Sequence, residues 1–130
     1  MASTLKINTL TGVTTAGSIA VTGEGNSTTT NLQQGLIKVW TRFNGDSFDT
    51  SGADTFNVTS LTDDGTGDYT ITIANDFSSV NFVQLSSGNN FHALNDSANT
   101  SGTMQFGNYG SSHTRANSGR LFVAGVGDLA

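Results

Sequence analysis

The chain contains no cysteine and no proline, and few of its 130 residues are charged. Without cysteine, it can form neither a disulfide bond nor a thiolate metal site. Its five Lys and Arg residues are outnumbered by ten Asp and Glu residues, which gives a net charge of −5. Binding to nucleic acid needs clustered positive charge to displace counterions. The composition therefore predicts that the protein has no nucleic-acid partner.

Long apolar segments are also missing. No apolar run approaches the roughly 20 residues that a membrane-spanning helix needs. Near the start of the chain, Lys6 is the only basic residue and no continuous apolar stretch follows it, unlike the arrangement in a secretory signal peptide. We therefore expect no signal peptide and no insertion into a membrane.

Small polar residues take the place of the missing types. Glycine, serine, threonine and asparagine together make up about half of the chain. They are poor helix formers, and no stretch has apolar residues at the i, i+3, i+4, i+7 spacing of an amphipathic helix. Eight Phe, two Tyr and one Trp nevertheless supply more large apolar side chains than a disordered chain normally has. The composition favours an all-β fold.

Alternating apolar and polar residues mark the expected strands, because a strand with one buried and one solvated face has this period of two. The alternating segments are residues 37–43, 55–59, 69–73, 80–85, 103–106 and 121–126. Turn sequences rich in Gly, Asn and Asp separate them, and Asp63 to Asp68 predicts a hairpin connection. The pattern predicts an antiparallel β-sandwich, jelly-roll-like in architecture, over residues 36–130.

Residues 1–35 differ from the rest of the chain. They hold many Thr, Gly and Ser residues, and residues 11–31 include no aromatic side chain. Ordering each residue costs roughly 1–2 kcal/mol of conformational entropy, which so few apolar side chains cannot offset alone. The segment is either a flexible tail or an extended arm that a partner orders. We expect an arm that anchors or trimerises the protein through Leu5, Ile7, Leu10, Ile19 and Val21.

Groups suited to catalysis are scarce. His92 and His113 are the only two histidines, and neither lies in a recognised nucleophile motif. Glu24 is the sole Glu and belongs to the expected arm, which makes it a poor partner in a general acid–base pair. A polysaccharide hydrolase would need paired carboxylates on facing strands, whereas the Asp residues cluster in turns. We predict that the protein is not an enzyme and has no cofactor.

Three carboxylates lie close together in the sequence, at Asp63, Asp64 and Asp68. They could chelate a hard cation, but their spacing differs from that of an EF-hand loop, which needs more oxygen ligands and a terminal Glu. Asp and Gly are also the residues that tight turns select for backbone reasons. We favour a structural turn over a calcium site and predict no metal site.

Trp40 is the most informative single residue. In the alternating segment it shares a face with Lys38 and Arg42 and not with Val39 and Phe43, so the ring is expected on the side opposite the core. An outward Trp suits either an anchor at a subunit interface or a platform on which a sugar stacks. A third interpretation is partial burial under a neighbouring loop. We favour the contact between subunits.

Four segments, taken together, resemble one class of protein. Residues 1–9 (MASTLKINT) are similar to the opening of many short structural proteins of marine tailed phages of the cyanophage type. Residues 38–45 (KVWTRFNG) resemble the K-x-W-x-x-F-N-G strand of the tail-fibre-like β-domains of these phages. Residues 56–70 and 121–128 resemble the segments that follow this strand and close the domain.

The resemblance implies a virion structural protein on the exterior surface of a phage particle, most simply a homotrimer. The implied role is a capsid-decoration or cement protein, a spike or a fibre component that contacts other capsid or tail proteins through the arm. An alternative is the receptor-binding tip of a tail fibre that recognises a glycan of the host surface. In that case Tyr109 and His113 are the expected glycan contacts, with Trp40 as a further candidate.

Overall fold

The computed structural model of the chain describes residues 4–12, 19–23, 25, 27–94 and 98–130. It divides into two compact units, Met1–Gly35 and Leu36–Ala130. The division falls at the change in composition on which the predicted boundary near residue 35 was based. In the part of the chain that the structure describes, no helix is long and apolar enough to cross a membrane.

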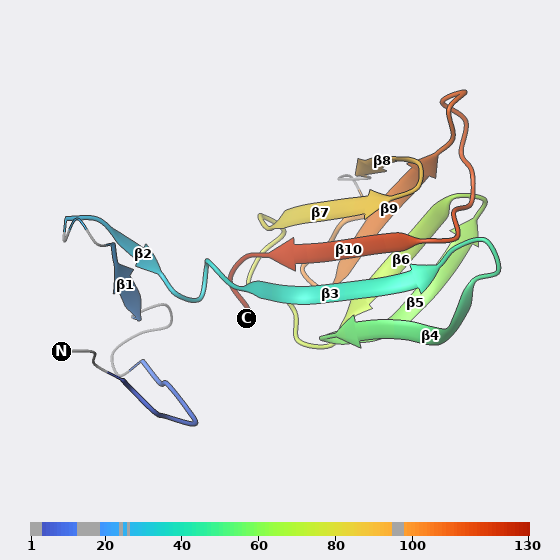
Figure 1. Cartoon of the computed structure of the whole chain (residues 1–130). Coiled ribbons are helices and arrows are strands. Elements are labelled where there is room, and N and C mark those ends of the chain that lie inside the picture. Colours follow the sequence, from blue (N-terminus) through green and yellow to red (C-terminus); the bar gives the residue numbers. More distant parts are fainter. Residues whose placement is uncertain (1–3, 13–18, 24, 26, 95–97) are drawn as a thin grey trace. The chain divides into compact units, whose positions relative to one another are not determined.

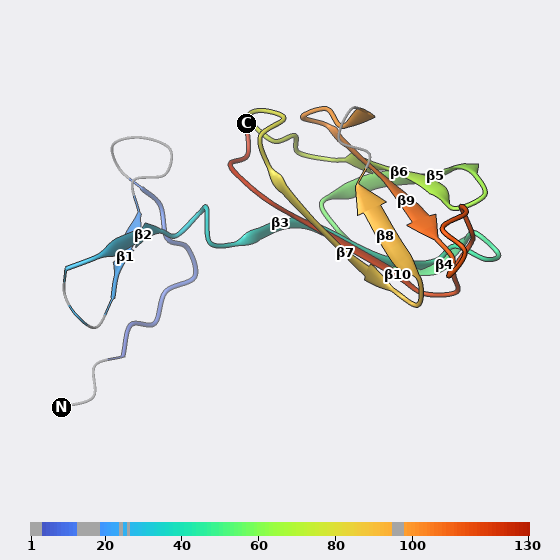
Figure 2. The same ribbon diagram turned by 90° about the horizontal axis from the view of Figure 1, so that it is seen from above.

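The second unit is a β-sandwich, which confirms the predicted all-β antiparallel fold (Figures 1 and 2). Its strands are β3 (Ile37–Asn44), β4 (Asp49–Phe56), β5 (Val58–Gly65), β6 (Asp68–Ile73), β7 (Val83–Gly88), β8 (Phe91–Leu94), β9 (Thr103–Tyr109) and β10 (Leu121–Val126). One four-stranded sheet has the order β4-β3-β10-β7, and the other has the order β5-β6-β9-β8. A hairpin joins β3 to β4 in the first sheet, and hairpins join β5 to β6 and β8 to β9 in the second. The other connections of the sandwich cross from one sheet to the other.

The core lies between the two sheets. Along β6, Tyr69, Ile71 and Ile73 are buried while the residues between them are only half-buried, as the sequence alternation predicts. The aromatic rings meet edge to face at the centre, where the Phe43 and Tyr69 centroids lie 5.4 Å apart. Fully burying one such large apolar side chain stabilises the fold by roughly 1.5–3 kcal/mol. The buried apolar residues are Val39, Phe43, Tyr69, Ile71, Ile73, Phe77, Met104, Phe106, Leu121 and Val123.

The expected strand over residues 55–59 is wrong, because the chain changes sheets inside it. β4 ends at Phe56 and β5 begins at Val58. Asn57, between them, has a φ of 58°, a left-handed conformation that Asn tolerates better than most residues. Its side-chain amide donates to the carbonyl oxygens of Lys38 (3.0 Å) and Asn75 (3.1 Å). These bonds fix the corner at which the chain leaves one sheet and enters the other.

The expected alternation in β3 holds from Val39 onward but not before it. The pairing of β3 with β10 shifts between Gly125 and Val126, so that Gly125 faces Val39 while Val126 faces Ile37. Lys38 is the extra residue of this bulge. As a result, Ile37 is exposed and Lys38 is largely buried, the reverse of the predicted arrangement.

The alternating segment 80–85 contains only the beginning of a strand. β7 starts at Val83, and Val80 lies before it as an exposed residue. Phe82 packs on Phe77, with stacked rings whose centroids are 4.4 Å apart. Gln84 is the buried residue of the strand, and its side chain bonds to Asn99.

The first unit contains one short hairpin that the sequence analysis did not predict. β1 (Ala20–Thr22) pairs with β2 (Thr29–Asn31) in antiparallel fashion. The Asn31 side-chain oxygen accepts the backbone N–H of Gln33 at 2.8 Å, a local bond that stabilises the turn after β2. Residues 4–12 belong to no strand. The sparse apolar side chains of this unit therefore form no core of their own among the described residues.

Candidate functional site

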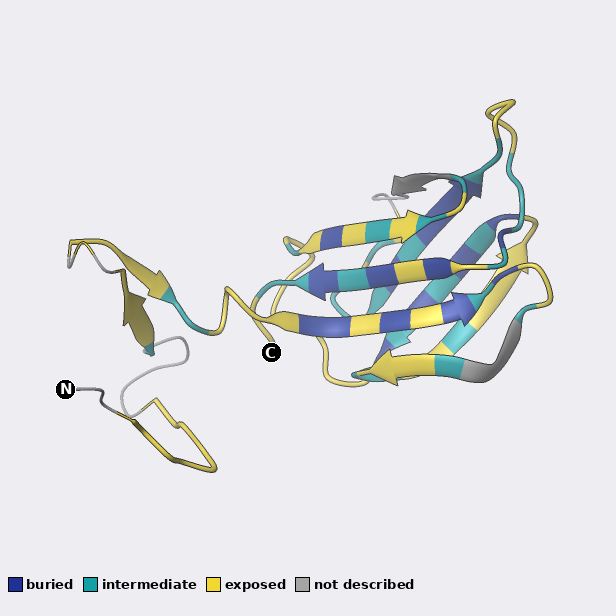
Figure 3. Ribbon diagram, in the orientation of Figure 1, coloured by how far each residue is buried: buried dark blue, intermediate teal, exposed yellow. Residues whose placement is uncertain are grey.

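The outward face of the β4-β3-β10-β7 sheet carries an unusual number of large apolar side chains. One row crosses all four strands, because Trp40 pairs with Phe56 on one side and with Ala124 on the other, and Ala124 pairs with Leu85. Figure 3 shows the exposed positions alternating with buried ones along β3 and β10. The exposed large apolar residues of this sheet are Ile37, Trp40, Phe56, Val83, Leu85 and Phe122.

A second row next to it holds the charged groups of this face. Arg42 pairs with Asp54 in β4 and with Phe122 in β10. The Arg42 guanidinium lies over the Phe122 ring, with its Cζ atom 5.9 Å from the ring centroid, a cation–π arrangement. The Asp54 carboxylate is exposed and forms no hydrogen bond or ion pair with any described residue. Among the described residues, this face therefore contains an acid without an ion pair beside an apolar surface.

A groove of about 340 Å³ runs across these two rows. Its lining includes the large apolar side chains of Trp40, Leu85 and Phe122, and Asp54 lines it from β4. The large apolar side chains of this lining make the groove suited to holding apolar side chains. Exposed apolar patches of this kind usually mark an interaction site. We call this groove the sheet-face groove.

A second hollow of about 480 Å³ continues the apolar surface toward the start of β3. Ile37 and Phe56 line it from the sheet, and Leu36 and Leu129 line it from the ends of the sandwich. All four side chains are exposed. The apolar surface of the sandwich thus extends from the centre of the sheet to the end at which the first unit is attached.

The predicted contact residues of the arm are exposed in the first unit. Leu5 is 79% exposed, Ile7, Leu10 and Val21 are about half exposed, and Ile19 is half-buried. Leaving apolar surface in water costs about 25 cal/mol per Å². Among the described residues of this unit, the exposed side chains have no core that covers them. The structure thus places five of the predicted interface residues in one unit and Trp40 in the other.

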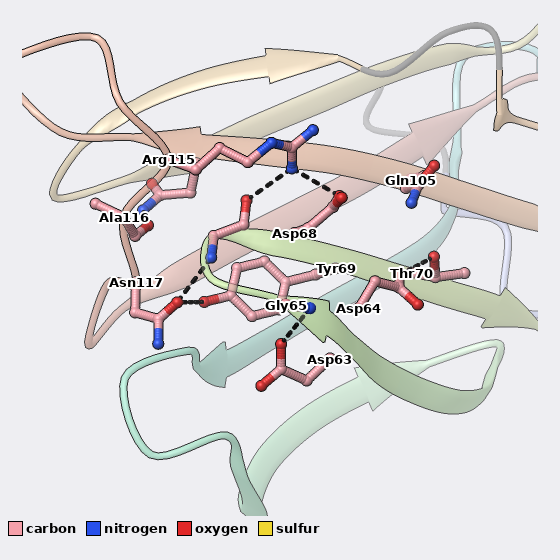
Figure 4. Close-up of polar contacts among 12 residues, drawn as sticks. Asp63, Asp64, Gly65, Asp68, Tyr69, Thr70, Gln105, Arg115, Ala116 and Asn117 are labelled. Carbon is pink, nitrogen blue, oxygen red and sulfur yellow. Dashed lines mark hydrogen bonds and ion pairs between the residues drawn. The ribbon is translucent and has the colours of Figure 1, made fainter.

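The three carboxylates of the predicted turn point to different partners (Figure 4). Asp63 accepts the backbone N–H of Gly65 at 3.0 Å, and Asp64 accepts the Thr70 hydroxyl at 2.5 Å. Asp68 forms an ion pair with Arg115 at 2.8 Å. The residues that the structure describes include no group of three or more acidic or histidine side chains placed to hold a metal ion. The hairpin itself is present, with β5 and β6 joined through Thr66 and Gly67.

Tyr69 and Asn117 fasten this hairpin to the loop between β9 and β10. The Tyr69 hydroxyl donates to the Gly45 carbonyl oxygen at 2.9 Å and lies 3.2 Å from the Asn117 side-chain oxygen. The same Asn117 oxygen accepts the Gly67 N–H at 2.7 Å. Burial of the phenol raises the pKa of Tyr69 to about 12, and the nearby negative charges of Asp63 and Asp46 add to this shift.

Gly67 lies at the centre of this contact and can only be glycine. Its φ is 64°, in the left-handed region that glycine adopts without steric cost. A Cβ atom at this position would lie 2.5 Å from the Asn108 carbonyl oxygen and 2.7 Å from the backbone of Ala116. The hairpin turn therefore packs directly on the backbone of the β9–β10 loop.

Of the two predicted glycan contacts, Tyr109 lies at the base of this loop and His113 at its tip. Tyr109 ends β9, and the Arg115 guanidinium lies over its ring at 5.5 Å from the centroid, so one ring face is already covered. His113 is exposed at the tip, where its N–H donates to the Gly110 carbonyl oxygen at 3.0 Å. Trp40 lies on the outward face of the other sheet. The structure therefore does not gather these three residues into one sugar site.

Among the described residues, the structure does not bring together the side chains that could act as acid, base or nucleophile. Ser112, which precedes His113 and could serve as a nucleophile beside it, is exposed, and its hydroxyl lies 2.9 Å from the Thr114 hydroxyl. The side chain of His92 lies outside the described residues, and so does Glu24.

Phe56, Leu85 and Phe122 were not predicted as partners of Trp40. Leu85 and Phe122 alternate with the core residues of their strands. This alternation alone indicates that both side chains point away from the core. What the sequence could not supply is the strand order that places these residues beside β3.

Comparisons of the chain with protein-family models, with curated proteins and with solved structures gave no match.

Proposed function

We propose that this protein is a non-enzymatic structural module of a phage virion. It is a short trimeric surface module, a capsid-decoration or cement protein, a spike or a fibre component, and it docks onto other virion proteins through its N-terminal arm. The resemblance of residues 1–9, 38–45, 56–70 and 121–128 to structural proteins of marine tailed phages supports the viral context.

One structural observation carries the proposal: each of the two units, taken by itself, exposes large apolar side chains. Exposed apolar side chains that lie together are a common feature of interaction surfaces. Here Trp40, Leu85 and Phe122 surround one groove, and Leu5 and Ile7 are exposed in the other unit. Large aromatic residues at the centre of such a patch are typical anchors of protein interfaces. An assembly role uses both surfaces, whereas a monomeric role uses neither.

The molecular mass of the full chain in solution tests the assembly. Native mass spectrometry should give a species of three times the 13.5 kDa chain mass. Deletion of residues 2–30 should convert it to a monomer while the sandwich stays folded by circular dichroism. A full chain that stays monomeric at all accessible concentrations contradicts the proposal, and so does a trimer that survives the deletion.

The exterior location needs a test on particles. Immunogold electron microscopy of intact phage particles with an antibody against the sandwich should label the outer surface. Proteomic analysis of the same purified particles should detect the chain. Particles that lack the chain altogether contradict a structural role.

The alternative function is recognition of a host-surface glycan by a tail-fibre tip. It is favoured by the β9–β10 loop, which extends beyond the two sheets in Figure 1. This loop has Tyr109 at its base and His113 at its exposed tip. A glycan array probed with the full chain tests this function, and binding should be lost in His113→Ala. Incorporation into particles without any glycan binding leaves the structural role alone.

A further inference from the structure

We propose that the sheet-face groove receives residues 5–10 of the arm of a second copy of this chain. This inference rests on the proposed function, because it takes the arm as the docking element. It goes further by naming the surface that the arm occupies. In this arrangement each chain gives its arm to one neighbour and receives the arm of another.

The dimensions of the two partners agree. Neighbouring strands lie about 4.8 Å apart, so the four strands β4, β3, β10 and β7 span roughly 14 Å from the first axis to the last. An extended chain advances about 3.3 Å per residue, so Leu5 and Leu10 can lie roughly 17 Å apart. The groove is lined by residues of all four strands. An extended segment from Leu5 to Leu10 is thus long enough to cross it.

The side-chain chemistry agrees as well. In an extended segment, Leu5 and Ile7 lie on one side and Lys6 on the other. The two apolar residues can contact the lining supplied by Trp40 and Leu85, while the long Lys6 side chain reaches the rim. Lys6 is the only cation of the first 35 residues.

The rim of the groove offers one acid for this cation. Asp54 is exposed and unpaired among the described residues, because the neighbouring Arg42 lies over the Phe122 ring. The groove and the arm therefore carry opposite charges, Asp54 at the rim and Lys6 in the arm.

The distribution of net charge favours the arm over a second sandwich as the occupant. The sandwich contains nine of the ten acids and four of the five cations, so all of the net charge of −5 belongs to it. The arm contains only Lys6 and Glu24 and is neutral. Packing two sandwiches face to face brings like net charges together, which opposes association. An arm that enters the groove meets no such repulsion.

A second copy, and not the chain's own arm, is the occupant that follows from the proposed function, in which the arm joins one copy to the next. Leu5 is 79% exposed, and Leu85 is 53% exposed. Mutual exchange of arms around a rotation axis buries both sets in every copy and closes the assembly. Three copies related in this way use all arms and all grooves.

Disulfide trapping between single-cysteine chains tests the contact, and the absence of natural cysteine makes the result unambiguous. One chain carries Asn8→Cys in the arm, and an affinity-tagged chain carries Ser87→Cys at the groove. The two chains are mixed, allowed to exchange and oxidised. A tagged mixed dimer is expected on non-reducing gels. The matched control, Thr62→Cys, places the thiol on the exposed face of β5 in the other sheet and should give at least tenfold less mixed dimer.

The same experiment identifies the occupant. A chain with both Asn8→Cys and Ser87→Cys should link to its neighbours and form covalent oligomers. An internally linked monomer overturns the inference in favour of the chain's own arm. Equal trapping at residues 87 and 62 also overturns it. If the full chain assembles but residue 87 never traps the arm, this inference fails while the proposed assembly stands; if the chain is monomeric, both fail.

A charge exchange gives a second readout that does not depend on cysteine. Asp54→Lys should raise the dissociation constant of the oligomer about two- to fivefold, the effect of losing one surface ion pair. Lys6→Glu combined with Asp54→Lys should restore the original value. Asp64→Lys, which makes the same change of charge on the β5–β6 hairpin, should leave the constant unchanged. Equal weakening by both single variants, or no rescue by the double variant, contradicts the predicted pairing.

Discussion

Tyr69 joins the core to the turns at one end of the sandwich. Its ring packs in the core, and its hydroxyl donates to the Gly45 carbonyl oxygen. Tyr69→Phe removes this bond and leaves a buried carbonyl oxygen without its donor, so the free energy of unfolding should fall by about 1–2 kcal/mol. Urea denaturation measures the change. Tyr109→Phe, which removes the hydroxyl of the half-buried Tyr109, should change stability less; an equal loss contradicts the role of the Gly45 bond.

The Tyr69 hydroxyl should also make the free energy of unfolding depend on pH in the alkaline range. Burial raises the pKa of Tyr69 to about 12, against an ordinary value of 10.0. Below pH 10 the phenol is protonated in the folded and the unfolded chain, so the full stabilisation is present. Above pH 10 the unfolded chain loses its proton first, and stability falls by about 1.4 kcal/mol per pH unit until the folded phenol also ionises.

Denaturation curves collected between pH 8 and pH 12 check this prediction. Tyr69→Phe has no phenol at this position, so its stability should fall less steeply with pH than that of the natural chain. Identical slopes for the two proteins contradict the buried-phenol explanation.

Gly67 shows how one residue holds two loops together. Gly67→Ala puts a side chain into a left-handed backbone position and against the backbone of Asn108 and Ala116. We expect a loss of about 2–4 kcal/mol of unfolding free energy from backbone strain and overpacking. Thermal denaturation measures it. Gly110→Ala is the control, in the β9–β10 loop on which the turn packs, because its Cβ would meet only ordinary contacts at 3.5 Å or more. Similar losses in both variants contradict the proposed packing.

At the scale of the element, the corner at Asn57 decides how the two sheets are connected. Asn57→Ala loses the side-chain bonds to Lys38 and Asn75 and keeps the strained backbone, so it should cost about 2–4 kcal/mol. Asn57→Gly loses the same bonds but relieves the strain, and it should be the more stable of the two by about 1 kcal/mol. Chemical denaturation ranks the variants. An alanine variant as stable as the natural chain contradicts the corner's role.

The strands were predictable to different degrees, and the reasons are physical. β6 could be predicted because each of its apolar residues faces the core. The 55–59 segment could not, because an Asn that hydrogen-bonds two distant carbonyls ends the strand, and those carbonyls are remote in sequence. The bulge at Lys38 depends on the partner strand β10, which local sequence does not reveal. Trp40 could be placed on the outward face, whereas its neighbours Phe56 and Leu85 follow only from strand order.

At the scale of the whole molecule, substitutions of two adjacent residues of β3 should affect folding and assembly separately. Trp40 points outward and Val39 is fully buried. Trp40→Ser should weaken the oligomer in sedimentation or light-scattering measurements and leave the unfolding free energy of the sandwich within about 1 kcal/mol of the natural value.

Val39→Ala should do the opposite. It removes methyl groups from a packed core, so it should lower the unfolding free energy by about 1–3 kcal/mol with little effect on the size of the oligomer that remains folded. If Trp40→Ser destabilises the sandwich as strongly as Val39→Ala, the outward face contributes to the fold itself and the assembly role loses its main support.

Leu36 and the β9–β10 loop lie at opposite ends of the sandwich, because the start of β10 pairs with the end of β3. β3 begins next to Leu36, where the first unit is attached, and its other end at Gly45 bonds to Ser118 of the β9–β10 loop. Exposed loop tips are the sites at which proteins best tolerate insertions. A foreign peptide placed between Ser112 and His113 should be displayed at the end remote from the attachment point. One end of the sandwich thus holds the connection to the first unit, and the opposite end can hold an inserted peptide.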